Sequence, residues 1–81
     1  MPTVFREAGY RFFFYSNEGD PREPVHVHVQ SAESESKFWI KDEVTLARSD
    51  GFDALTLRKI LKIIERNKNK VEEKWYEHFG E

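Results

Sequence analysis

The sequence contains no cysteine, which excludes disulfide bonds, thiolate nucleophiles, iron–sulfur clusters and cysteine-ligated zinc. Small secreted domains usually depend on disulfides, so this absence favours a reducing compartment. No run of apolar residues approaches the roughly 20 that are needed to span a bilayer, and the first residues lack the basic-then-apolar pattern of a signal peptide. We therefore expect a cytoplasmic protein that does not enter a membrane.

Neither sign of charge dominates, since the formal net charge is -2 at pH 7. This balance argues against a protein that binds nucleic acid over its whole surface. The stretch from Arg58 to Lys70 is basic, but a solvated helix face is the simpler interpretation of such a run. Aromatic residues, in contrast, are abundant at 15% of 81 residues. The chain has room for a single domain, residues 1–81, in which these rings supply much of the buried area.

The spacing of the apolar residues changes near residue 52. Before that point it alternates, which predicts strands at residues 3–6, 10–15, 25–29 and 36–41. Residues 43–47 are ambiguous between an edge strand and a turn, while residues 16–24 and 49–51 are typical of a loop and a chain break.

After residue 52 the apolar residues recur every three or four positions, as in a helix. Asp53 is a suitable N-cap and Gly80 a suitable C-cap. Near Lys68 the apolar stripe is interrupted, so we expect either a break in the helix or a Lys68 side chain that extends to solvent. The prediction is an α+β fold: a small antiparallel β-sheet of three to five strands, with a C-terminal helix or broken helix pair packed on one face.

Alternation sorts the strand residues onto two faces of this sheet. One set is nearly all apolar and is expected to pack against the helices: Tyr10, Phe12, Phe14, Val25, Val27, Val29, Phe38 and Ile40. The other set combines aromatic, imidazole and cationic side chains: Arg11, Phe13, Tyr15, His26, His28, Lys37, Trp39 and Lys41. We expect this second face to be exposed to solvent.

The second face suits planar or anionic ligands. Its aromatic members could stack on the bases of RNA or DNA, and its cationic members could bind phosphates. Two alternatives need no such ligand. The rings could simply pair across strands, or a homodimer could cover the face.

His26 and His28 lie on the same face of one predicted strand, roughly 7 Å apart at the backbone. They could act as the acid and base of a metal-independent ribonuclease, bind phosphate or bases, or only pack. Metal binding would need a third ligand. His78 sits at the helix end, which leaves the carboxylates Glu18, Asp20 and Glu23. None of these has convincing spacing, so we expect no metal and no cofactor.

Several segments together resemble a known family. They are Pro2–Arg6, Gly9–Glu18, Pro24–Val29, Lys37–Ile40, Leu46–Arg48, Gly51–Phe52 and Trp75–Gly80. In this order and spacing they resemble the DUF4160 family of small bacterial proteins over nearly the whole chain. Two departures are a longer loop at residues 19–23 and Val25, rather than proline, before His26.

The resemblance implies little chemistry, because the function of the family is unknown. It does imply a gene often found beside one for a small DUF2442-type protein, an arrangement like that of toxin–antitoxin modules. From this we expect a partner protein, and RNA or DNA as the eventual target. Our first hypothesis is a non-catalytic binding component of such a module, and the alternative is the ribonuclease that uses His26 and His28.

Overall fold

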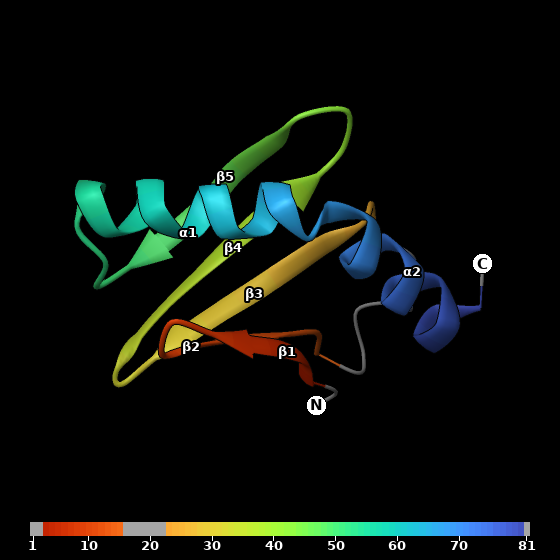
Figure 1. Cartoon of the computed structure of the whole chain (residues 1–81), viewed down its shortest axis with the longest axis horizontal. Coiled ribbons are helices and arrows are strands. Elements are labelled where there is room, and N and C mark those ends of the chain that lie inside the picture. The colour runs from red at the N-terminus through yellow and green to blue at the C-terminus, as the bar shows by residue number, and fades with distance from the viewer. Residues whose placement is uncertain (1–2, 16–22, 81) are drawn as a thin grey trace.

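A computed structural model describes residues 3–15 and 23–80 of the chain. In these ranges the elements are β1 (Thr3–Glu7), β2 (Tyr10–Phe13), β3 (His26–Ser31), β4 (Ser34–Ile40), β5 (Val44–Asp50), α1 (Ala54–Arg66) and α2 (Lys68–Phe79). The strands form one antiparallel sheet in the order β1-β2-β3-β4-β5 (Figure 1). The predicted α+β fold is confirmed. Most of the predicted loop, residues 16–22, lies outside the described residues.

Two-residue turns set the register of the β1–β2 and β3–β4 hairpins. Ala8 and Gly9 join β1 to β2 with φ values of 56° and 85°, as in a type I′ turn, whose twist matches that of the strands. Ala32, at φ 52°, opens the turn between β3 and β4. Positive φ crowds the Cβ of an L-residue, so both alanines occupy unfavourable backbone conformations. The short turns leave no freedom for the strands to slip.

The ambiguity over residues 43–47 is resolved in favour of a strand. β5 pairs with β4 from Val44 opposite Ile40 to Asp50 opposite Glu35, with one register shift between Lys37 and Phe38. The predicted chain break at residues 49–51 therefore comes too early: the strand ends at Asp50 and is followed by Gly51, which has φ 102°. Ladder hydrogen bonds to β4 outweigh the local turn preference of Ser49 and Asp50.

Asp53 begins α1 as an N-cap, as predicted. Its carboxylate oxygen Oδ1 accepts a hydrogen bond from the backbone N–H of Thr56 at 2.8 Å. Hydrogen bonds from the Thr56 side chain and backbone lower the pKa of Asp53, because they favour the ionised carboxylate.

The predicted helix break is confirmed at Asn67, which separates α1 from α2. The Asn67 side chain donates to the carbonyl of Ile63 at 2.8 Å, so it satisfies a carbonyl at the end of α1. The Lys68 ammonium donates to the Asp42 carbonyl at 2.9 Å. Gly80 ends α2 in the left-handed conformation at φ 78°, as expected of a C-cap.

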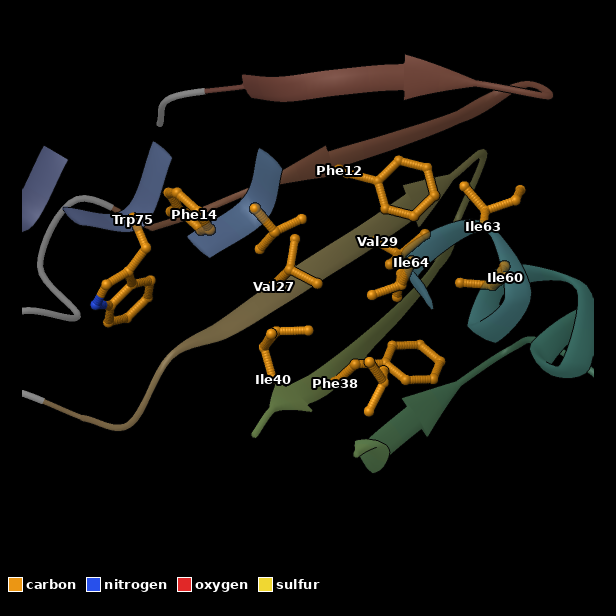
Figure 2. Close-up of a cluster of buried hydrophobic side chains, with 12 residues drawn as sticks. Phe12, Phe14, Val27, Val29, Phe38, Ile40, Ile60, Ile63, Ile64 and Trp75 are labelled. Carbon is orange, nitrogen blue, oxygen red and sulfur yellow. The ribbon is translucent and has the colours of Figure 1, made fainter. Parts of the chain in front are cut away.

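The hydrophobic core lies between the sheet and the two helices (Figure 2). Its sheet members are Phe12, Phe14, Val27, Val29, Phe38 and Ile40, and its largest helix members are Ile60, Ile64 and Trp75. We call this side of the sheet the inner face. Six of the eight residues predicted for it are fully buried, while Tyr10 and Val25 are partly buried and pack against the core.

Candidate binding face of the sheet

The side of the sheet opposite the helices, which we call the outer face, carries side chains that the strand register places in rows. One row is Phe13, His28, Lys37 and Arg48, and a second is Arg6, Arg11, Gln30, Glu35 and Asp50. A third contains His26, Trp39 and Thr45. The rows bring together the predicted aromatic, imidazole and cationic residues from β2, β3 and β4.

The prediction that this face is exposed is wrong for three of its members. Phe13 and His28 are 1% exposed and His26 is 0% exposed. The other predicted members are half-buried (Arg11, Tyr15, Lys37 and Trp39) or exposed (Lys41). Alternation therefore assigns these side chains to the correct face, but it does not determine what covers them.

Aromatic rings enclose His26. The centroid of its ring lies 5.5 Å from that of Trp39, 5.2 Å from that of His28 and 5.0 Å from that of Trp75. Trp75 belongs to α2, which lies beside the end of the sheet where β3 begins (Figure 1). A helix residue thereby reaches an imidazole of the outer face, which the alternation of the strands could not reveal.

Polar contacts fix the orientation of the His26 ring. Its Nδ1 lies 2.9 Å from the carbonyl oxygen of Pro24. A carbonyl can only accept, so this bond requires the proton on Nδ1. Glu23 Oε1 lies 3.7 Å from the same nitrogen and accepts a hydrogen bond from the Lys37 ammonium at 3.1 Å. A carboxylate shared by an imidazole and an ammonium links β4 to the start of β3.

His28 has a matching environment. Its ring stacks on Phe13 at 5.5 Å between centroids and meets the edge of Tyr15 at 4.6 Å. Its Nδ1 lies 3.6 Å from Glu35 Oε2, which also accepts the Tyr15 hydroxyl at 2.9 Å. Each imidazole is thus buried against rings and placed beside one partly exposed carboxylate.

The predicted cations lie over the predicted aromatic rings. The Arg11 guanidinium is 4.3 Å from the centroid of Phe13, and the ammonium groups of Lys37 and Lys41 are 4.5 Å and 5.8 Å from that of Trp39. Cation–π attraction holds these three cationic groups over the rings of Phe13 and Trp39. Phe13 is buried and so offers no open ring to a base, whereas Trp39 keeps part of its surface accessible.

Sequence reasoning missed two cations of the outer face, Arg6 and Arg48. Arg6 stands directly opposite Arg11, and Arg48 directly opposite Lys37. Counting outward from the turn at Gly9 would have found Arg6. No local signal identifies Arg48, because its position depends on the pairing of β5 with β4.

Within residues 3–15 and 23–80, no group of three or more metal-ligating side chains is close enough to hold a metal ion. Of the carboxylates considered as a third ligand, Glu18 and Asp20 lie outside the described residues, and Glu23 lies beside His26. His78 packs on the ring of Phe79 at the end of α2. Neither helix of the described chain is long and apolar enough to cross a membrane.

A family model described as "Domain of unknown function (DUF4160)" matches residues 9–76. The chain belongs to the DUF4160 family. The resemblance seen in the sequence is confirmed, and the match includes every predicted residue of the outer face, while Arg6 precedes it. Comparisons with curated proteins and with solved structures gave no match.

Proposed function

We propose that this DUF4160 protein is a cytoplasmic, non-catalytic component of a toxin–antitoxin-like two-gene module that binds single-stranded nucleic acid through the outer face. The carrying observation is the gathering of cations on the outer face, where Arg6 stands opposite Arg11, and Lys37, which also donates to Glu23, stands opposite Arg48. Like charges directly opposed across strands destabilise a sheet. A phosphate backbone lying across the face would offset that repulsion.

The rings beside these cations support a single strand rather than a duplex. Trp39 and Tyr15 are half-buried, so part of each ring is accessible. Stacking of a base on an aromatic side chain contributes about 1–3 kcal/mol and needs an unpaired base. The net charge of the whole chain is -2, so a basic footprint confined to one face also suits binding that strengthens as the salt concentration falls.

Burial of the imidazoles favours binding over the ribonuclease alternative. A general acid or base must come within about 2.6–3.2 Å of the proton that it transfers. His26 and His28 are 0% and 1% exposed, and their neighbours are rings and carboxylates rather than an open cleft. We therefore assign the two imidazoles a structural role: they pack against the aromatic rings that the cations of the outer face contact.

The test is binding of a labelled 12-nucleotide single-stranded RNA, the matching DNA and their duplex, followed by fluorescence anisotropy over a range of KCl concentrations. We expect the single strands to bind more tightly than the duplex. Arg48→Gln should weaken binding and lower the salt slope by about 0.7, the contribution of one phosphate contact to a single strand. The matched control is Arg58→Gln, the same charge change at an exposed position of α1, which should bind as the wild type does.

Trp39→Ala and Arg11→Ala are expected to weaken binding while the far-ultraviolet circular dichroism stays unchanged. Normal binding of RNA, DNA and a DUF2442-type partner by both variants would refute the proposal. If only the partner protein binds, the nucleic-acid role is wrong. A homodimer that Trp39→Ala dissociates, seen by sedimentation, would reassign the face to self-association.

Cleavage is monitored by running the same RNA on a gel after incubation with and without chelator. An intact strand agrees with the proposal. Cleavage that the His26→Ala/His28→Ala double variant abolishes would establish the ribonuclease instead.

A further inference from the structure

We infer that a cavity at the β1–β2 corner of the outer face is a phosphate-binding site. The cavity has a volume of about 380 Å³, near the lower end of the roughly 300–1,000 Å³ of small-ligand sites. The residues that matter for this inference are Arg6, Arg11, Gln30 and Ser31 from the strands, with Gly9 and Ala32 from the two turns. The inference rests on the proposed function and names the group that this corner binds: a phosphate of the strand.

The lining has the chemistry of an anion site. It combines two arginines with an amide and a hydroxyl, and it contains no carboxylate. Planar guanidinium groups can hold a phosphate through two parallel hydrogen bonds each. The register places Arg6 directly opposite Arg11, so both can approach one ligand from neighbouring strands.

The charge of Arg6 is not neutralised by the acid beside it in sequence. Within the described chain, Arg6 forms no ion pair. Glu7 instead accepts from the Arg66 guanidinium at 2.8 Å and from the Asn67 amide at 3.4 Å. Those contacts lie on the helix side of the sheet, so Glu7 does not neutralise Arg6 on the outer face.

Arg11 is positioned in advance. Its Nε donates to the Thr3 hydroxyl at 2.9 Å, its Nη1 donates to Gln30 Oε1 at 3.2 Å, and its guanidinium rests on the Phe13 ring. A donor held in place loses less conformational entropy when its ligand binds. Arg6 is exposed, and it supplies the adjustable second cation.

Backbone strain at the rim is a further observation. Gly9 and Ala32 border the cavity with φ values of 85° and 52°. Glycine adopts this conformation without strain, whereas alanine adopts it at an energetic cost. Residues held in such conformations cluster at ligand sites, and here the strained turn brings Ala32 beside the two arginines.

The test is a ¹H–¹⁵N NMR titration of the full chain with inorganic phosphate, with KCl adjusted to keep the ionic strength constant. We expect saturating shifts at the amides of Gly9, Arg11 and Ser31. Arg6→Gln should weaken phosphate binding at least tenfold, while the control Arg58→Gln leaves it unchanged. Arg6 is exposed, so its substitution should not unfold the protein, which the remaining amide shifts will verify.

Shifts that never saturate, or that are the same in both variants, would show only an ionic atmosphere and overturn the site. Titration with the 12-nucleotide RNA separates this inference from the proposed function. If the RNA binds the wild type and Arg6→Gln equally, the proposed function stands and the phosphate site is wrong. If phosphate saturates the cavity but the RNA does not bind, the site stands and the nucleic-acid role is wrong.

Discussion

The two faces of the sheet bury side chains by different means. Inner-face residues such as Phe12 and Val27 are fully buried against aliphatic and aromatic neighbours, so apolar area alone stabilises them. His26 and His28 on the outer face are equally buried, but they are polar and need hydrogen bonds or carboxylates to offset the loss of water. Side chains that are equally buried on the two faces are therefore stabilised by different interactions. The inner face depends on close packing of apolar side chains, whereas the outer face also depends on specific polar partners.

Trp75→Ala should give the largest effect, a loss of about 3–5 kcal/mol in the free energy of unfolding. Trp75 is 1% exposed and packs on Phe14 and Phe79 at centroid distances of 5.2 Å and 4.2 Å. Urea denaturation followed by circular dichroism measures the loss. Trp39→Ala is the matched control on the outer face, and it should cost less than half as much because Trp39 is only half-buried. Equal losses would mean that both faces depend on ring burial alike.

His26→Ala should give an intermediate effect. It removes a buried ring and leaves the Pro24 carbonyl without its 2.9 Å donor. Pro24 is exposed, so water can replace the donor, and loss of the hydrogen bond costs about 0.5–1.5 kcal/mol. The cavity left by the buried ring adds to that cost. Lys41→Ala, an exposed position on the same face, should change stability by less than about 0.5 kcal/mol. Unchanged stability in His26→Ala would contradict the structural role that we assign to this imidazole and would favour a role in catalysis or ligand binding.

Asp53→Ala should give the smallest effect, a decrease of a few degrees in Tm at pH 7, because it removes the cap of a helix that covers the inner face. The pKa of Asp53 is lowered from its ordinary value of 3.8 by the hydrogen bonds from Thr56. Its contribution is therefore complete above about pH 4 and is lost as the pH falls through the lower folded-state pKa. Thermal unfolding at pH 7 and pH 3 should show the difference from the wild type narrowing in acid. Asp53→Asn, which can also cap, should keep most of the stability without this pH dependence.

Local patterns predicted most of the fold. Alternation placed Val27 and Val29 on the inner face, and single residues such as Asp53 and Gly80 marked the helix ends. The assignment of β5 was left undecided because its residues include turn formers, which are extended here only because they pair with β4. The burial of His26 was missed because it depends on Trp75, which is far away in sequence. The candidate site was therefore predicted by residue type and face, but not by exposure.

The order of the strands has a consequence for how the chain assembles. Each strand pairs with its neighbour in sequence, so the strand pairings join segments that are near in sequence and form at a low entropic cost. The ion pair between Glu7 and Arg66 spans 59 positions, and such contacts form only when the helices dock. A nascent chain that ends before residue 54 would contain all five strands but no helix. The apolar inner face of its sheet would therefore be exposed to solvent. We expect this intermediate to bind chaperones or to self-associate until α1 and α2 have been synthesised and pack on the inner face.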